Sequence, residues 1–171
     1  MAKTMIMRIL ITLLICVFTL TSWSQNMTNE RLGQIITKQA DSVSGGNGQW
    51  QFVYKEAQML CVTDVRANRM RIISPITQAD LLTKDLMLDA LTANFHTALD
   101  VRYAISQGLV WSAFIHPLQE LSDYEVEEAL NQVYLAAATF GTTFSSTPMV
   151  FGAGAVPAAA EEEKETPVNK L

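Results

Sequence analysis

Residues 94–118 read NFHTALDVRYAISQGLVWSAFIHPL, and the hydrophobic period changes inside this stretch. Up to His96 the apolar residues recur as they do on a helix, whereas from Asp100 onward apolar and polar residues alternate with the two-residue period of a strand. The apolar face of this first strand carries Val101, Tyr103 and Ile105. A second apolar run, residues 109–115, comes shortly after it. The spacing predicts an antiparallel hairpin that turns at residues 106–108.

Before this hairpin the sequence predicts a helix, three strands and a second helix. The first helix covers residues 28–43, where apolar residues recur at three- and four-residue steps. The strands cover residues 50–55, 58–64 and 69–74. Pro75 is expected to end the third strand because proline cannot donate to a sheet. The second helix is capped by Asp80 or Thr83 and ends near His96. Its apolar row is Leu88, Leu91 and Phe95.

After the hairpin the sequence predicts a last helix. Ser122 and Glu125 stand at the spacing of a capping box, and Gly141 suits the C-terminal end. The helix carries a long apolar stripe, formed by Val126, Ala129, Leu130, Val133, Ala137 and Phe140. This stripe is expected to face the core, and part of it is a candidate dimer face. The order helix, three strands, helix, two strands, helix predicts an α+β fold, an antiparallel sheet with helices packed on it.

The glycine-rich segment SGGNG, residues 44–48, is predicted to be a plain connecting loop. A phosphate-binding loop lies between a strand and a following helix, and it often carries a lysine. Here the predicted order is helix, loop, strand. The sequence therefore argues against a phosphate-binding site at these glycines.

The two histidines of the chain, His96 and His116, are the first candidates for chemistry. A metal site needs three or four converging ligands, and no paired histidine or cysteine spacing provides them. No Gly-x-Ser-x-Gly nucleophile motif occurs. His96 and Asp100 would form a base and its orienting carboxylate only if the helix continued through Asp100, which the strand alternation opposes. We therefore expect no metal, no cofactor and no catalytic residue.

A structural interpretation accounts for these polar residues. His96 covers the end of the helix, Asp100 and Arg102 make polar contacts across the sheet, and His116 anchors the turn before Pro117. The alternative is a small periplasmic hydrolase or ligand-binding enzyme that uses His96, Asp100, Arg102 or His116. That alternative requires the four side chains to converge in one pocket.

Arg69 and Arg71 share one face of the third predicted strand, opposite Met70 and Ile72. The simplest interpretation places the two arginines on the solvent side of a sheet. A site for an anion or an acidic partner is the alternative.

The first 24 residues have the layout of a secretory signal peptide. Lys3 and Arg8 precede the apolar run of residues 9–18, and small polar residues follow it. Ser22 and Ser24 have the spacing that a signal peptidase recognises, so we expect cleavage after Ser24. An uncleaved membrane anchor is the alternative, but the run is shorter than the roughly 20 residues of a spanning helix. We therefore expect an exported protein, periplasmic or secreted, with no membrane span after cleavage.

Cleavage would leave Cys61 as the one cysteine of the mature chain. Cys16 would leave with the signal, since Ile15 stands where a lipoprotein signal has a small residue. A single cysteine cannot form an internal disulfide, so an apolar core must hold the fold together. Cys61 lies in an apolar run, where a thiol is usually inert.

The mature chain is predicted to hold one domain, residues 25–151, which is a usual single-domain length. Residues 152–171 are rich in Ala, Pro and Glu, and they are predicted to be a flexible tail. The mature chain has 10 basic and 17 acidic residues, a formal net charge of −7. That sign and the expected export argue against nucleic acid as a partner.

The element order and several short segments resemble the YbjN-domain family, within the type III secretion chaperone-like fold. The segments are Asn68-Arg69-Met70-Arg71-Ile72, Asn94-Phe95-His96, Asp100-Val101-Arg102-Tyr103 and Phe114-Ile115-His116-Pro117-Leu118. The resemblance covers residues 28–145. It implies a small α+β binding module without general catalytic chemistry, and many such proteins are homodimers that hold an extended protein segment. Secretion chaperones work in the cytoplasm, so the export signal argues against a role in feeding a secretion needle.

These observations favour an exported, non-enzymatic binding protein that acts as a chaperone, adaptor or regulator on another envelope protein. A homodimer is an expected state. The candidate partner-binding or structural polar residues are Arg69, Arg71, Asn94, His96, Asp100, Arg102 and His116.

Overall fold

The computed structural model describes residues 26–147. The predicted signal peptide and the predicted tail lie outside the described residues. The elements in chain order are α2 (Asn29–Gln39), β1 (Ser42–Gly46), β2 (Gln49–Tyr54), β3 (Ala57–Asp64), β4 (Arg69–Gln78), a 3-10 turn (Ala79–Leu81), α3 (Lys84–His96), β5 (Val101–Ser106), β6 (Leu109–His116) and α4 (Asp123–Ala138).

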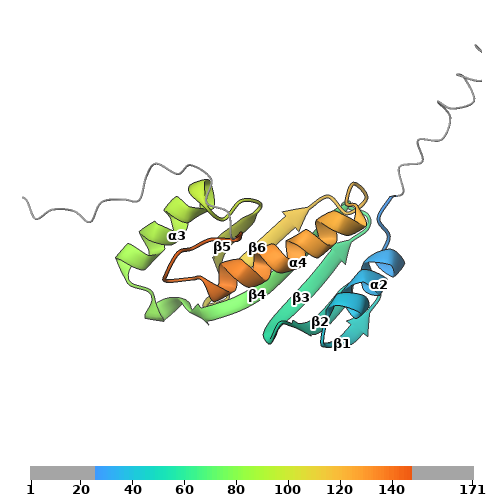
Figure 1. Ribbon diagram of the computed structural model, residues 1–171, viewed down its shortest axis with the longest axis horizontal. Coiled ribbons are helices and arrows are strands. Elements are labelled where there is room, and N and C mark those ends of the chain that lie inside the picture. The colour runs from blue at the N-terminus through green and yellow to red at the C-terminus, as the bar shows by residue number, and fades with distance from the viewer. Residues whose placement is uncertain (1–25, 148–171) are drawn as a thin grey trace, which may run out of the picture.

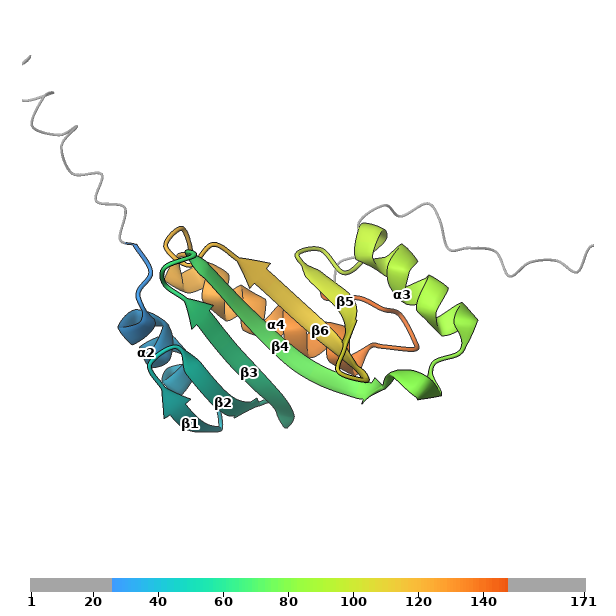
Figure 2. The ribbon, with the colours of Figure 1, turned by 180° about the vertical axis from the view of Figure 1, so that it is seen from behind.

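The described strands form one antiparallel six-stranded sheet in the order β1-β2-β3-β4-β6-β5. Helices α2 and α4 cover one face of this sheet, α2 over β1 and β2 and α4 over β4, β5 and β6 (Figure 1). Figure 2 shows the opposite face of the sheet with no helix over it. Helix α3 lies beyond β5, at the side of the sheet. The predicted α+β class with an antiparallel sheet is confirmed.

The core lies between the sheet and the two helices that cover it. Along β2, side chains alternate between exposed Gln49 and Gln51 and buried Trp50, Phe52 and Tyr54. The larger fully buried side chains include Leu32, Ile36, Met59, Met70, Ile72, Leu130, Val126 and Val133. Burying one such side chain stabilises a fold by about 1.5–3 kcal/mol, so this layer supplies most of the driving force.

The predicted hairpin is confirmed. Strand β5 pairs with β6 in the register Val101↔Phe114 to Ser106↔Leu109, and Gln107 and Gly108 turn the chain with φ of 51° and 74°. Of the three residues on the apolar face of β5, Val101 and Tyr103 are buried, whereas Ile105 near the turn is exposed.

Two hydroxyl groups tie the hairpin to α4. The Tyr103 hydroxyl donates to the Ala136 carbonyl (2.9 Å), and the Ser112 hydroxyl donates to the Val133 carbonyl (3.0 Å). Both groups are buried in the apolar layer, so these bonds avoid the cost of unpaired polar atoms.

The glycine-rich segment is a strand and a turn, so the prediction of a plain loop is wrong. Helix α2 ends at Gln39, and Val43 belongs to β1. Asn47 and Gly48 form the turn to β2 with φ of 52° and 93°. A Cβ at Gly45 would lie 2.4 Å from the Gln49 carbonyl oxygen, so β1 forms only because a glycine stands there.

Pro75 does not end the third predicted strand, because β4 continues to Gln78. Beyond Ile73 strand β4 has lost its β3 partners and pairs with β6 alone. The register against β6 also shifts between Pro75 and Thr77. Proline is tolerated at such an edge or bulge position because no donor is needed there.

The last two helices begin as predicted. Thr83, not Asp80, caps α3, and its hydroxyl accepts from the Leu86 amide (3.2 Å). The capping box at Ser122 and Glu125 is present. Helix α4 ends at Ala138, and its buried stripe contains Ala136 in place of Ala137. Phe140 lies past the helix and packs edge-on against Tyr103.

Candidate protein-binding site

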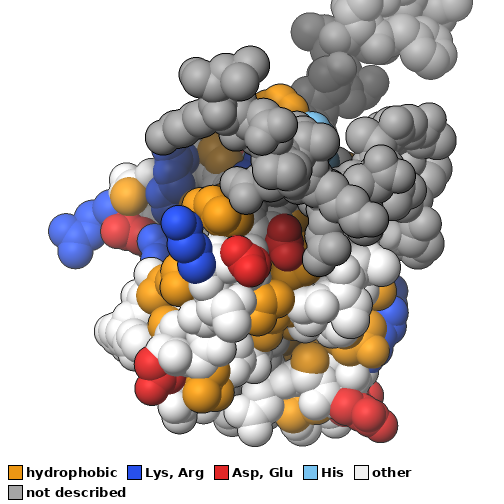
Figure 3. All heavy atoms as spheres, turned by 90° about the vertical axis from the view of Figure 1, so that its left-hand side faces the viewer, with side chains coloured by type: hydrophobic (Ala, Val, Ile, Leu, Met, Phe, Trp, Pro, Cys, Tyr) orange, Lys and Arg blue, Asp and Glu red, His pale blue; other side chains and the backbone are white. Residues whose placement is uncertain are grey.

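The apolar row of α3 points away from the core. Ala90 and Ala93 are the buried residues of this helix, and their small side chains form its inner face. Leu88, Leu91 and Phe95 are 51%, 65% and 86% exposed, and Leu81 and Met87 extend the exposed surface. The sequence identified this apolar row but did not indicate which side of the helix faces the core. Figure 3, which views the molecule from the α3 side, shows hydrophobic side chains at the surface among polar and charged ones. We call Leu81, Leu88, Leu91 and Phe95 the α3 row.

Helix α3 is held firmly although few of its side chains are buried. The Asn94 side chain accepts from the Tyr103 amide (2.7 Å) and donates to the Tyr103 carbonyl (3.2 Å). At the C-terminal end, Thr97 donates to the Phe144 carbonyl (2.6 Å) and accepts through its own carbonyl from the Ser146 amide (3.2 Å). The exposed apolar row is thus displayed on a fixed element.

A second exposed surface is the face of the sheet that no helix covers (Figure 2). Leu60, Ile73 and Ala113 are direct neighbours across β3, β4 and β6. The adjacent row holds Val62, Arg71 and Ile115. These side chains alternate along their strands with the core-facing ones, so they point to the open side, where Ala113 is only 7% exposed. We call the surface formed by these six residues the open sheet face.

A groove of about 400 Å³ lies next to the open sheet face. It is lined by Ser42, Val43, Ser44, Gln51, Phe52, Val53, Gln58, Met59, Leu60 and Pro75. Strands β1 to β3 supply most of this lining, and β1 is also the outermost strand on that side. An extended chain could therefore find apolar contacts and unpaired strand backbone in the same place.

The two arginines of β4 lie on the open side, as the simplest interpretation predicted. The Arg69 guanidinium donates to the Asn68 carbonyl (3.0 Å), and Asp64 is its register partner on β3. Arg71 stands between Val62 and Ile115. Among residues 26–147 neither guanidinium has a carboxylate within 4 Å, so both charges are open to a partner.

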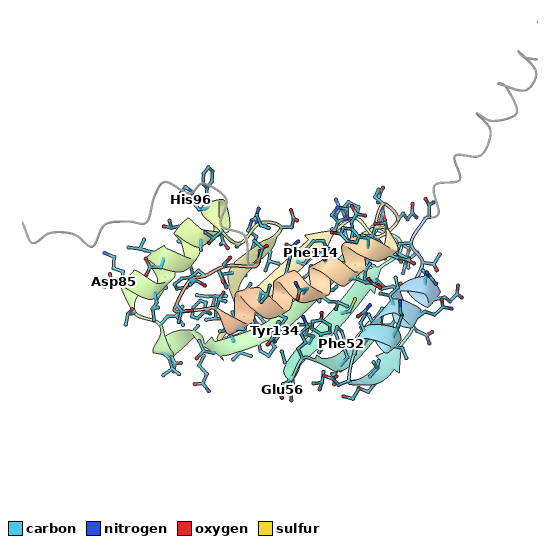
Figure 4. All side chains as sticks on the ribbon, viewed as in Figure 1. Phe52, Glu56, Asp85, His96, Phe114 and Tyr134 are labelled. Atoms are coloured by element: carbon cyan, nitrogen blue, oxygen red, sulfur yellow. The ribbon has the colours of Figure 1, made fainter. Side chains whose placement is uncertain are left out.

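The residues of the enzyme alternative do not converge. His96 ends α3, is exposed, and meets the Phe95 ring edge-on at 4.9 Å. Figure 4 shows its side chain pointing away from the sheet. Arg102 lies on the open side, where it donates to the carbonyls of Val101 (2.7 Å) and Leu99. Arg102 thus contacts backbone next to it in the chain, not a group across the sheet.

Asp100 and His116 do line one cavity of about 340 Å³, beside α4. The Asp100 carboxylate accepts from the Gln132 amide (3.5 Å), so its contact reaches a helix and not a strand. His116 Nδ1 donates to the Pro117 carbonyl (2.8 Å), and its ring stacks on Phe114. The other lining residues are Leu121, Tyr124, Glu125 and Glu128. His96 and Arg102 are not among them.

Two further observations bear on chemistry. Burial raises the pKa of the Cys61 thiol to about 12, so it is not poised as a nucleophile. In the described part of the chain, no group of three His, Cys, Asp or Glu side chains could hold a metal ion.

The open sheet face was not predicted from the sequence, although a signal for it exists. Residues 59–62 are apolar without alternation, which indicates a strand with apolar side chains on both faces. Because α2 and α4 cover only one of these faces, the second set is left facing out.

No protein-family model matches the chain, and no curated protein matches it. Solved structures that are similar to it include the following two. A chain of the HopA1–SchA chaperone–effector complex gives a TM-score of 0.51 at 12% identity, over 64% of this chain and 88% of that chain. A chain of the ExsC–ExsE complex gives a TM-score of 0.51 at 15% identity, over 64% of this chain and 86% of that chain. The likeness shows that the protein has the type III secretion chaperone-like fold.

Proposed function

We propose that this protein is a non-enzymatic, chaperone-like binding protein that holds an extended segment of another envelope protein. The observation that carries the proposal is the open sheet face, with apolar Leu60, Ile73 and Ile115 beside a groove and an open strand edge. The likeness of the fold to a chain of a chaperone–effector complex supports a protein as the ligand. Arg71, within the same face, favours a segment that combines apolar side chains with an acidic group.

The proposed location is the periplasm or the exterior. It rests on the signal-like residues 1–24. Within residues 26–147, no helix has both the length and the apolar character needed to cross a bilayer. We also propose membership of the YbjN-domain family, on the segments quoted above.

We propose further that two copies associate through the α3 row. Three large apolar side chains stand exposed on α3, and Leu81 stands exposed on the 3-10 turn before it. In a two-fold dimer the same patch occurs on both subunits, so an apolar row can pack against itself. The stripe of α4 is buried in the core, which removes it as the dimer face.

The test of the proposed function is capture of crosslinked partners from envelope extract by mature protein, residues 25–171. Leu60→Asp/Ile73→Asp places two acids on the open sheet face, and both positions are only partly buried. His96→Ala/His116→Ala is the matched control, because it removes the two histidines and leaves that face intact. Urea unfolding of each variant verifies that it is folded.

We expect one envelope protein to be enriched by the wild type and the histidine variant and lost by the Asp variant. Crosslinks between that protein and residues of β1 to β4 should accompany the enrichment. Equal capture by the Asp variant would refute the role of the open sheet face. Hydrolytic turnover that disappears in the histidine variant would refute the non-enzymatic function.

A further inference from the structure

The described chain ends beside the α3 row. After α4 the chain turns back, and the Ser146 hydroxyl donates to the Ala98 carbonyl (2.7 Å) while its amide donates to the Thr97 carbonyl (3.2 Å). Thr97 is the residue directly after α3. Three hydrogen bonds, including the one from Thr97 to Phe144, therefore fix the exit point of the chain at the C-terminal end of this helix.

The next residues are apolar, and they have the reach to cover the row. Residues 148–151 read PMVF, and they precede a stretch of Gly, Ala, Pro and Glu. Four extended residues span roughly 13 Å. At about 1.5 Å per residue, Leu91 lies about 9 Å back along the helix from Thr97. Met149 and Phe151 can thus reach Phe95 and Leu91.

We propose that residues 148–151 pack on the α3 row of the free subunit. The row offers apolar surface with no described neighbour over it, and the segment offers large apolar side chains next to it. Burying both removes apolar area from water, and because the segment is tethered at Thr147, its local concentration at the row is high. No other stretch of residues 148–171 combines three large apolar side chains in a row.

The proposal has a regulatory consequence, which rests on the proposed dimer. The segment and a second copy would compete for the same row. A segment that covers the row in about nine molecules of ten would weaken the apparent dimer affinity roughly a hundredfold, because both subunits must uncover their rows before they associate. Truncation after Thr147 should therefore tighten the dimer by about that factor.

The first test is an engineered disulfide. Thr92 is exposed on α3, and Thr92→Cys/Val150→Cys leaves the α3 row, Met149 and Phe151 in place. Gln51→Cys/Val150→Cys is the control, because Gln51 points to the open side of the sheet. Cys61 is buried and does not interfere. The second test is sedimentation of chains 25–171 and 25–147, with Met149→Asp/Phe151→Asp as a full-length variant.

We expect an intrachain disulfide in the Thr92 pair and none in the control, in monomeric protein. The truncated chain and the Asp variant should both dimerise roughly a hundredfold more tightly than the wild type. Equal disulfide yields in the two pairs, or an interchain bond in their place, would overturn the packing of the segment. A specific intrachain bond without any dimer, even after truncation, would reject the proposed dimer and leave the segment on α3.

Discussion

Asn94 connects a helix to a sheet through one side chain. Its amide group satisfies both backbone polar groups of Tyr103, with distances of 2.7 Å and 3.2 Å. The sequence placed Asn94 among the candidate polar residues, but its partner could not be inferred, because the pairing depends on how α3 turns onto β5. The position of α3 and its exposed row depends on this contact.

Asn94→Ala should lower the free energy of unfolding by about 1–3 kcal/mol, because two partly buried backbone groups lose their partner. Asn94→Asp keeps the acceptor for the Tyr103 amide but places a carboxylate oxygen against the Tyr103 carbonyl, so it should also destabilise the fold at pH 7. Urea unfolding followed by circular dichroism measures both. If both variants unfold like the wild type, the contact does not hold α3.

Glu125 gives a pH-dependent contribution to the start of α4. Hydrogen bonds from the backbone and side chain of Ser122 lower the pKa of this carboxyl below its usual 4.5. A pKa lowered in the folded state stabilises the protein above the unfolded-state pKa, and this contribution is lost as the pH falls through the folded-state pKa.

Glu125→Ala should therefore lower the free energy of unfolding by about 1 kcal/mol at pH 7 and by clearly less below pH 4. Glu128→Ala is the control, because Glu128 lies on the same helix three residues after the capping box. Chemical unfolding at several pH values gives the difference between wild type and variant. A cost that does not change with pH would contradict the capping role of the charge.

Cys61 should react very slowly in the folded protein. Burial raises its pKa to about 12 from 9.0, so at pH 8 the thiolate fraction falls by roughly three orders of magnitude. We expect a thiol reagent to label the native mature chain far more slowly than the chain in denaturant. Fast native labelling would show that β3 opens or that the thiol is accessible.

At the scale of elements, α3 and α4 have similar apolar rows and opposite roles. The row of α4 is buried under β4, β5 and β6, whereas the row of α3 is exposed because Ala90 and Ala93 form its inner face. A hydrophobic period indicates which residues share a face of a helix, but it does not indicate which face packs against the core. The sequence could therefore place both helices and their caps, but it could not assign the outward side of α3.

The contrast between the helices can be measured with one substitution in each. Leu130→Ala removes a fully buried side chain of α4 and should cost about 2–5 kcal/mol. In the chain 25–147, which lacks the proposed covering segment, Leu91→Ala on α3 should change the free energy of unfolding by less than about 0.5 kcal/mol. Equal costs in unfolding experiments on dilute, monomeric protein would mean that the α3 row is covered by something substantial.

Two strand predictions failed for physical reasons. Strand β1 contains two serines and two glycines, so it has little intrinsic strand preference and forms by pairing with β2. The dipeptide Asn47-Gly48 was the available signal, since it is a typical two-residue hairpin turn. The extension of β4 past Pro75 depends on its pairing with β6 beyond the last β3 partner at Ile73, which is a property of the sheet and not of the local sequence.

At the scale of the whole molecule, the fold class could be predicted because each long element carries its own signal. The hairpin, the capping box of α4 and the strands of the central sheet all appear in the sequence. The candidate binding surfaces could not be predicted, because a surface is exposed only where no helix packs on it. The sequence does not show where the helices pack. The choice of the covered sheet face depends on how α2 and α4 cross the sheet.

The sheet should unfold as one unit, because its six described strands are continuous and α4 spans three of them. Trp50 on β2 and Trp111 on β6 are the tryptophans of mature protein, and they report on different ends of the sheet. Trp50→Phe and Trp111→Phe leave one fluorophore each. Urea transitions of the two variants should each coincide with the transition seen by circular dichroism. Separate fluorescence and circular dichroism midpoints would reveal two independent halves.

The two outer strands of this sheet are unequal, and the inequality limits how copies can join. Fibre growth by strand addition needs an acceptor edge on both sides of every added unit. In this protein the Asn94 side chain is hydrogen-bonded to the backbone amide and carbonyl of Tyr103 on β5. Strand β1 is the outermost strand on the other side of the sheet. Strand addition at β5 is therefore opposed at Tyr103, so repeated addition lacks the second fully open edge that fibre growth needs.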